Sequence, residues 1–376
     1  MRRLMFVPGA AATVAAVVLA AGPSAAATGW KVVSVPGTGS LSGISADSAS
    51  DAWAVGTSGS GFTAKPLADH WNGKSWQQVA LGSTERTLTA VSAASPADAW
   101  AVGTNTGYEA GRFAFAWHWD GSTWTEAGPP GNTRQGVADI GPGNAYAVGQ
   151  VLAHWTGTGW SAQSFPNPAQ PGQSTTTPPG GGLDAVSADG ASDVWVVGSY
   201  STATSCATTC EETFALHWDG SSWQLAPMPP VNRSTDPNLN YTLGSVDVIG
   251  PADVWAAGYT DDATAPFGSS VGTLTEHWDG TRWSVVPSPS PGSAPALTGI
   301  AGNSAASVWA VGHDTPSGAT APQTLTVFWN GTSWAVVASP DPGGNGQLSS
   351  VSATPGAATF WAAGTGGKGP LVLRNG

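Results

Sequence analysis

Five histidines could bind a metal ion or act in acid–base chemistry, and they recur along the chain at regular intervals. Each stands directly before a Trp, as in the segment HWDGSSW: they are His70, His118, His154, His217 and His277. Each therefore occupies the same position of a different repeat, and a ring of repeats would hold them apart. The pattern predicts structural histidines, packed or hydrogen-bonded within their own repeats, and no shared metal site.

The carboxylates form two groups. One group precedes a Trp by two residues, where a short carboxylate can accept hydrogen bonds from the backbone of a turn; it consists of Asp51, Asp98, Asp193 and Asp253. The other group comprises Glu211-Glu212 and Asp261-Asp262, which we expect in loops as solvated charges. A loop calcium site at Asp261-Asp262 is the alternative, because oxygen ligands suit that ion.

Motifs for several kinds of catalysis are missing from the sequence. It contains no nucleophile elbow, phosphate-binding loop or zinc-protease helix. A glycan-active enzyme would instead need carboxyls near a central axis, for which Asp139, Asp184 and Asp247 are the candidates. We expect a protein that is not an enzyme and needs no cofactor.

Composition limits the partners. The 376 residues include 12 basic and 24 acidic side chains, for a net charge of −12. Binding to a nucleic-acid backbone needs clustered Lys and Arg, so nucleic acid is not expected as a partner. The 20 Trp residues favour a compact, turn-rich body over a disordered chain.

The first 27 residues predict export. Arg2 and Arg3 precede an apolar run, and Ala25-Ala26-Ala27 provides a small-residue cleavage site. We therefore expect a secreted, extracellular protein whose mature chain has no membrane span. In that oxidising setting Cys206 and Cys210, the only cysteines, are predicted to form a disulfide.

Internal repeats are the main signal for the fold. The segment LSGISADSASDAWAVG starts at Leu41, and six related segments follow it; their central aromatics lie 46 to 60 residues apart. Six of the repeats continue into a second segment with two Trp residues five positions apart, such as Trp71 and Trp76. This period is typical of propeller blades.

Each repeat predicts four short strands, which we call a to d. Strand a is LxxVS. Strand b is DAWAVG, in which Trp and Val share one face and Ala the other. Strand c ends in HW, and the following Asp-Gly or Asn-Gly predicts a tight hairpin into strand d, which begins at the second Trp.

The last repeat lacks strand d, and the start of the mature chain supplies one. The chain ends at LVLRNG, whereas residues 28–33 resemble the start of a strand d. The N-terminal strand can thus complete the last blade and hide its open edge. The prediction is an all-β, seven-bladed β-propeller of four-stranded blades formed by residues 28–376, after a signal peptide at residues 1–27.

With its DxWAVG and HWDGxxW repeats, the chain resembles a family of secreted bacterial β-propellers whose blades are organised like those of kelch and galactose-oxidase propellers. It departs from kelch in ending strand b with one Gly instead of two, and from WD40 repeats in carrying the second Trp. The galactose-oxidase likeness would imply copper chemistry, which needs a Cys near a Tyr and His ligands outside the repeats. Only His313 lies outside them.

Loop lengths indicate which face of the ring binds. The interval from the Gly of strand b to the His position varies from 5 to 19 residues, whereas the c–d turn is constant. We call the face with the b–c and d–a connections the loop face, and the opposite face the turn face. Irregular loops on a rigid scaffold tend to carry binding residues; the candidates are Tyr108, Tyr200, Tyr241, Tyr259, Phe267 and His313.

Three functions remain open. The favoured one is a lectin-like or protein-binding module that recognises an extracellular glycan or protein through the loop face. The second is a glycan-active enzyme with carboxylates near the axis, and the third is a passive structural or adhesive protein. We expect a monomer unless the chain is part of a larger assembly.

Overall fold

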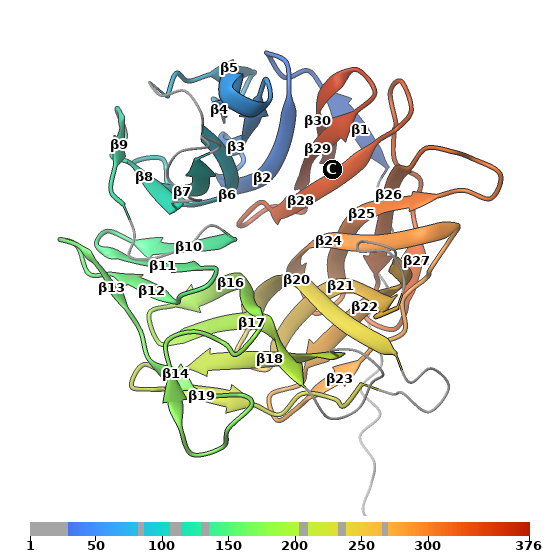
Figure 1. Cartoon of the computed structure of the whole chain (residues 1–376). Helices are drawn as coiled ribbons and strands as arrows, with labels where there is room; N and C mark the ends of the chain where they lie inside the picture. Colours follow the sequence, from blue (N-terminus) through green and yellow to red (C-terminus); the bar gives the residue numbers. More distant parts are fainter. Residues whose placement is uncertain are drawn as a thin grey trace, which may run out of the picture.

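The chain forms a closed ring of seven four-stranded antiparallel blades, as predicted (Figure 1). The computed structural model describes residues 29–81, 86–105, 114–128, 135–202, 210–231, 238–264 and 270–376. Within these ranges the only helical element is the three-residue turn η1 (Gly61–Thr63). No described helix has the length and apolar character needed to cross a membrane.

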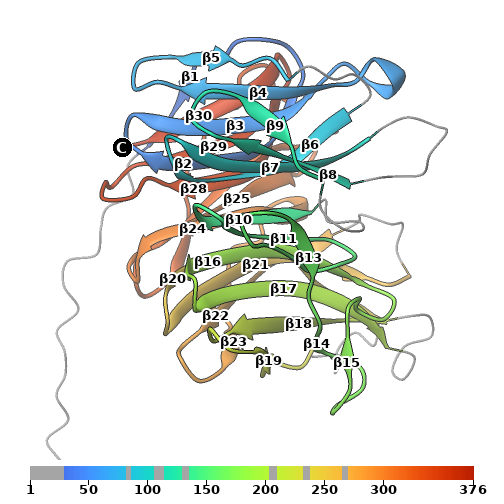
Figure 2. The ribbon, with the colours of Figure 1, turned by 90° about the vertical axis from the view of Figure 1, so that its left-hand side faces the viewer.

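Strand a of each blade lines the axis and strand d lies at the rim (Figures 1 and 2). The first three blades are β2 (Ser40–Ser48), β3 (Asp51–Ser58), β4 (Lys65–Trp71) and β5 (Trp76–Gln78); β6 (Arg86–Ser95), β7 (Asp98–Asn105), β8 (Ala114–Trp119) and β9 (Trp124–Glu126); and β10 (Gly136–Gly141), β11 (Asn144–Val148), β12 (Ala153–Trp155) and β13 (Trp160–Ala162). A small hairpin, β14 (Phe165–Pro166) and β15 (Ser174–Thr175), follows blade 3.

The next three blades have the same strand order. They are β16 (Gly182–Gly190), β17 (Asp193–Thr202), β18 (Cys210–Trp218) and β19 (Trp223–Ala226); β20 (Leu239–Gly250), β21 (Asp253–Asp262), β22 (Ser270–Trp278) and β23 (Trp283–Val285); and β24 (Ser293–Ser304), β25 (Ser307–Thr315), β26 (Gln323–Trp329) and β27 (Trp334–Val336). Glu211-Glu212 and Asp261-Asp262 therefore lie in β18 and β21, not in loops as expected.

The two faces of strand b pack against two different blades. In β3, Trp53 and Val55 join a cluster with Val91 and Trp124 of blade 2. Ala52 and Ala54 join a cluster with Trp361 of blade 7. The alternation of large and small side chains thus fits each strand b between its neighbours, as the sequence predicted.

The Gly that ends strand b is required by close backbone contact. A bulge in β2 between Leu41 and Gly43 brings the backbone of strand a against strand b. A Cβ at Gly56 would collide with the carbonyl oxygen of Ser40. This explains why the DAWAVG segment ends in Gly.

Aromatic contacts join each blade to the next. The ring centroid of Trp53 lies 5.0 Å from that of Trp119 and 4.9 Å from that of Trp124, both in blade 2. The planes of Trp53 and Trp124 meet at 79°, the edge-to-face arrangement that aromatic pairs prefer. The corresponding contacts at the other junctions are Trp100 with Trp155 and Trp160, Tyr146 with Trp223, Trp195 with Trp278 and Trp283, Trp255 with Trp329 and Trp334, Trp309 with Trp30, and Trp361 with Trp71 and Trp76.

The N-terminal strand completes the last blade, as predicted. Blade 7 consists of β28 (Gln347–Ala353), β29 (Phe360–Gly366), β30 (Gly369–Asn375) and β1 (Trp30–Val33), in this order. Strand β1 runs antiparallel to β30, with Trp30 opposite Asn375. Trp30 is buried and meets Trp309 of blade 6 at a centroid distance of 5.0 Å.

Replacing Trp30 with Ala tests this closure. Removing a buried Trp side chain costs about 3–5 kcal/mol through lost burial and the cavity left behind, so we expect a clearly lower melting temperature in calorimetry. Lys31→Ala is the matched control, because Lys31 lies on the same strand and is exposed. Equal melting curves for wild type and Trp30→Ala would contradict closure by β1.

Candidate functional site

The repeated histidines are structural. The Nε2–H group of His70 donates to a carboxylate oxygen of Asp51 at 2.8 Å, and its ring stacks on Trp53 at a centroid distance of 4.4 Å. The same arrangement joins His118 to Asp98, His154 to Asn144, His217 to Asp193 and His277 to Asp253. Each imidazole thus bridges strands b and c of its own blade, and no group of three His, Cys, Asp or Glu residues among the described residues could hold a metal ion.

One expectation about the aspartates was wrong. Asp51 and its counterparts were expected to accept hydrogen bonds from the backbone of the a–b turn. They instead accept from the His side chains of strand c, and Asp193 and Asp253 also accept from the indole N–H of the Trp two residues later. The sequence spacing between Asp and His varies with the b–c loop, which concealed this pairing.

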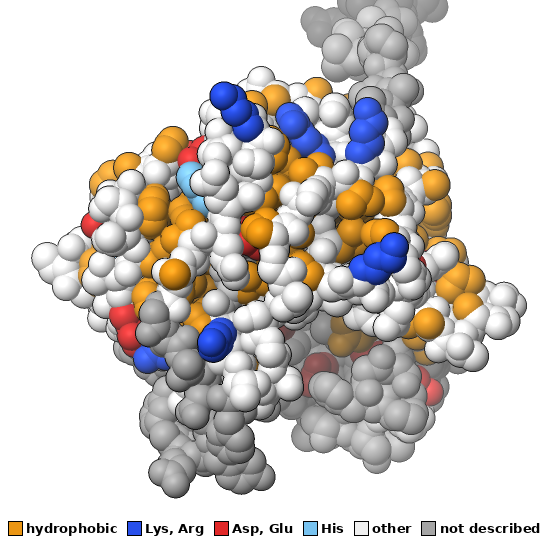
Figure 3. Space-filling view, turned by 90° about the horizontal axis from the view of Figure 1, so that it is seen from above, with side chains coloured by type: hydrophobic (Ala, Val, Ile, Leu, Met, Phe, Trp, Pro, Cys, Tyr) orange, Lys and Arg blue, Asp and Glu red, His pale blue; other side chains and the backbone are white. Residues whose placement is uncertain are grey.

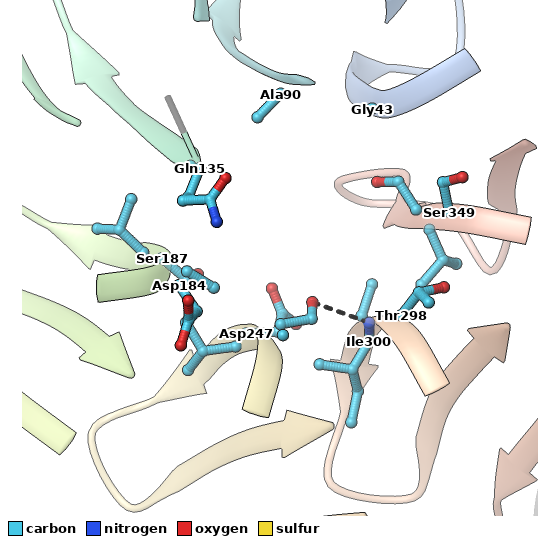
Figure 4. Close-up of a pocket in the computed structure, with 18 of the residues that line it drawn as sticks. Gly43, Ala90, Gln135, Asp184, Ser187, Asp247, Thr298, Ile300 and Ser349 are labelled. Atoms are coloured by element: carbon cyan, nitrogen blue, oxygen red, sulfur yellow. Dashed lines mark hydrogen bonds between the residues drawn. The ribbon is translucent and has the colours of Figure 1, made fainter. Parts of the chain in front are cut away.

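A central channel of about 590 Å³ runs between the strands a of the seven blades. Hydroxyl groups dominate its wall, together with glycines and small apolar side chains (Figure 4). Asp184 and Asp247 are the only charged side chains that line it within the described part of the chain. Asp139, the third axial candidate, does not line the channel; its carboxylate accepts from the backbone of Gly141.

Hydrogen bonds between strand a of one blade and strand a of the next stabilise the channel wall. The backbone N–H of Ala93 donates to the hydroxyl of Ser45 at 3.0 Å, so the Ser of LxxVS bonds to the next blade. Equivalent bonds run from Asp139 to Ser92, from Val248 to Ser187 and from Ala46 to Ser352. In blade 5 Asp247 takes this role and accepts from the N–H of Gly302 at 2.8 Å. The sequence analysis missed this function of the motif, although the recurring Ser was its signal.

Asp184 and Asp247 have different surroundings. Burial raises the pKa of Asp184 to about 7, and the nearby charge of Glu211 adds to the shift. Burial also raises the pKa of Asp247, to about 6, although its bond from Gly302 opposes the shift, and the acidic neighbours that act on it are Asp253 and Asp189. Asp184 lies toward the loop-face end of β16, beside the pairing of Leu183 with Gly198, whereas Asp247 lies opposite Trp255, toward the turn-face end of β20.

Tyr259 and Tyr200 face different cavities. Tyr259 lines the central channel and lies opposite Thr242 of β20. Tyr200 packs edge-on against Phe214 at 6.1 Å and opens onto a second pocket of about 290 Å³, which Pro168 and Met228 also line. Tyr259 is the first residue after the Gly of its strand b, whereas Tyr200 is the second. Because successive strand residues point to opposite faces of the sheet, the two rings point in different directions.

The remaining candidates are not brought together. Tyr241 is only 9% exposed and packs in the core between blades 4 and 5, so the structure does not present it as a binding residue. His313 is half-buried in β25 of blade 6, away from the channel, and burial lowers its pKa. Tyr108 and Phe267 lie outside the described residues, as does Cys206, so the Cys206–Cys210 disulfide stays a prediction.

The paired acidic residues separate into different roles. The charge of Glu211 raises the pKa of Asp184, whereas Glu212 lines the pocket with Tyr200. Asp262 accepts from the backbone and hydroxyl of Thr264 and so caps a turn, while Asp261 acts on the pKa of Glu211. No cluster of three His, Cys, Asp or Glu residues that could hold a metal ion forms around Asp261-Asp262 within the described ranges.

Comparison with known proteins supports the fold of the chain but identifies no family for it. No family model and no curated protein matches the chain. Solved structures do match: YCF48 bound to D1 peptide is 14% identical with a TM-score of 0.52, over 94% of this chain and 98% of the other. The GH74 xyloglucanase of Xanthomonas campestris is 14% identical with a TM-score of 0.57, over 92% of this chain and 53% of the other. U3-55K is 9% identical with a TM-score of 0.56, over 94% of this chain and 99% of the other. The chain is a seven-bladed β-propeller similar to these structures, and at such identities the likeness shows the fold alone.

Two carboxyls outside the channel are buried without partners. Asp69 and Glu276 occupy the position before the His of strand c in blades 1 and 5, and their carboxyl oxygens have no hydrogen-bond partner within the described ranges. Burial raises the pKa of Asp69 to about 7 and that of Glu276 to about 8. Both carboxyls are therefore held in the neutral form at mildly acidic pH.

These two groups make stability depend on pH. The unfolded chain releases the Glu276 proton near pH 4.5 and the folded protein only near pH 8, so unfolding becomes easier as pH rises between these values. Each pH unit across that window costs about 1.4 kcal/mol per group. We expect Glu276→Gln to flatten the fall in denaturant midpoint between pH 5 and pH 8, while the exposed control Glu126→Gln leaves the slope unchanged. If the denaturant midpoint of Glu276→Gln fell with pH as steeply as that of wild type, Glu276 would not be a source of the pH dependence.

Proposed function

We propose that the protein is a secreted, non-enzymatic binding module that recognises an extracellular partner at its loop face, where the central channel opens. The observation that carries the proposal is the polar channel with Asp184 and Tyr259 in its wall. A pocket that combines a few directed polar groups with an aromatic ring is the usual form of a ligand site. The predicted signal peptide supports export.

The carboxyl arrangement favours binding over glycoside hydrolysis. Most glycosidases need two carboxyls on either side of one bond. The acidic neighbour of Asp184 is Glu211, those of Asp247 are Asp253 and Asp189, and Asp247 is already bonded to Gly302. The GH74 xyloglucanase is an enzyme of the same fold, but this chain spans only 53% of its length.

The aromatic side chains favour a protein partner over a glycan. Sugar rings stack on exposed aromatic faces, yet the described Trp, Tyr and Phe side chains are all buried or half-buried. Most Trp rings are occupied in contacts between blades. YCF48 bound to D1 peptide illustrates that a propeller can hold a peptide.

On the side of the ring seen in Figure 3, Lys and Arg side chains are scattered singly among apolar and uncharged polar groups, without a basic patch. This distribution, together with the net charge of −12, supports the expectation that nucleic acid is not the partner. An extracellular protein is therefore the favoured class of partner.

The test uses the immobilised mature chain to capture proteins from extracellular medium, with a glycan array in parallel. Combined Tyr200→Ala and Tyr259→Ala changes should weaken capture about tenfold, because truncating an interface Tyr commonly costs more than 1 kcal/mol. Ser122→Ala with Ser222→Ala on the turn face is the control.

Weakened binding in the Ser control, with unchanged binding in the Tyr variant, would place recognition on the turn face. Binding to glycans alone, weakened by the Tyr changes, would replace the protein partner with a lectin function. Release of sugar products from an array glycan would identify an enzyme.

A further inference from the structure

The c–d hairpin turn begins with an acid in three blades and with an amide in two. Blades 2, 4 and 5 carry Asp120, Asp219 and Asp279 before the Gly of the turn, whereas blades 1 and 6 carry Asn72 and Asn330. In all five turns the side-chain oxygen of this residue accepts hydrogen bonds from the backbone N–H groups two and three residues later. The same donors therefore surround a carboxylate in three blades and an amide carbonyl in the other two.

These donors stabilise negative charge on the oxygen that they contact. Hydrogen bonds from the side chain of Ser122 and from the backbone N–H groups of Thr123 and Ser122 lower the pKa of Asp120 to about 2. Equivalent bonds lower the pKa of Asp219 and that of Asp279 to about 2 as well. Hydrogen bonds donated to a carboxylate favour its charged form. The turn thus favours an anionic oxygen at this position.

In the two Asn turns the same donors polarise the side-chain amide. The Oδ1 atom of Asn330 accepts from the backbone N–H groups of Thr332 and Ser333, at 3.0 Å each, and from the hydroxyl of Thr332 at 2.8 Å. The Oδ1 atom of Asn72 has two donors, the backbone N–H groups two and three residues later, at 3.1 Å each. When a nucleophile attacks the amide carbon, negative charge develops on Oδ1. The donors then stabilise it as an oxyanion hole does.

A nucleophile stands next in the chain, the backbone nitrogen of Gly73 or Gly331. Both glycines are exposed, with φ of 87° and 92°, and within the described ranges neither donates its N–H to a hydrogen bond. The sequence has two other Asn-Gly pairs, and both differ from these. The N–H of Gly346 donates to Asp341 at 3.4 Å, and Asn375 is buried in β30.

We propose that the c–d turns of blades 1 and 6 promote their own deamidation, which converts Asn72 and Asn330 into the Asp that three other blades carry. Hydroxide removes the proton of the Gly nitrogen, which bonds to Cγ; the Cγ–Nδ2 bond breaks, and the nitrogen leaves as ammonia with a proton from water. Water then opens the resulting succinimide at Cγ, which breaks the new bond and leaves a carboxylate. Each conversion consumes one water molecule and adds one negative charge. This modification is independent of the proposed binding function.

The turn also determines the product. Opening of the succinimide at the backbone carbonyl would give isoaspartate, whose extra methylene group lengthens the backbone of a tight turn. Opening at Cγ gives Asp, and the donors to Oδ1 favour this path because they stabilise the charge that develops there. We therefore expect mainly Asp in the folded protein.

The test incubates the mature chain at pH 8 and follows each Asn-Gly pair by proteolysis and mass spectrometry, with electron-transfer fragmentation to distinguish Asp from isoaspartate. Asn330 should convert fastest because it has three donors, followed by Asn72. Asn345 and Asn375 should convert at least about tenfold more slowly, because their sites lack this arrangement. Conversion at Asn345 or Asn375 that equals or exceeds conversion at the c–d turns would overturn the proposal.

Thr332→Val separates the effect of the donors from that of the Asn-Gly sequence. It removes one donor to Asn330 but keeps a side chain of similar shape at an exposed position. Conversion of Asn330 should slow about tenfold, as expected for the loss of a hydrogen bond to a developing charge. Asn72 in the same molecule is the matched control, and its rate should stay unchanged. An unchanged rate at Asn330, or isoaspartate as the main product, would refute promotion by the turn.

Discussion

The ring depends on one contact, repeated seven times: an aromatic side chain of strand b packs against aromatic side chains of the next blade. At most junctions Trp53 or its counterpart meets two Trp rings, one of them edge-on. His70 and its counterparts stack on the same ring and bond to an Asp of strand b, or in blade 3 to Asn144. The DAWAVG and HWDGxxW motifs are thus two halves of one interaction between neighbouring blades.

This constraint also determines what is left for recognition. The Trp residues are engaged in the ring, and the Ser of strand a is engaged in bonds across the channel wall, as Ser45 is with Ala93. The differences in length between blades are concentrated at the loop face, where blades 4 and 5 have long inner strands. Asp184 and Tyr259, which line the channel, belong to these two blades. The proposed site is therefore a local addition to a uniform scaffold.

The sequence predicted the architecture well because repetition exposes it. The Trp, Gly and hairpin turn of the repeat motifs each have several copies, and the missing strand of blade 7 was recognisable in Trp30 and its neighbours. The site was harder to predict because it has no copies. Glu211 and Asp261 lie in different blades, and the loop assignment of both was wrong. Tyr241 was a candidate because the loop lengths assigned it to the loop face, and its burial depends on packing between blades that strand periodicity does not specify.

The pairing of β1 with β30 has a consequence for folding. The first strand of the ring to be synthesised finds its partner only when the last one exists, since Trp30 lies opposite Asn375. Until β1 pairs with β30, Trp309 of blade 6 lacks its contact with Trp30, and the free edge of β30 is a site for pairing with another chain. The entropic cost of closing a chain grows only slowly with its length, so the long separation of β1 from β30 slows folding more than it lowers stability. Delayed closure would therefore favour aggregation or strand exchange between chains at this blade rather than elsewhere in the ring.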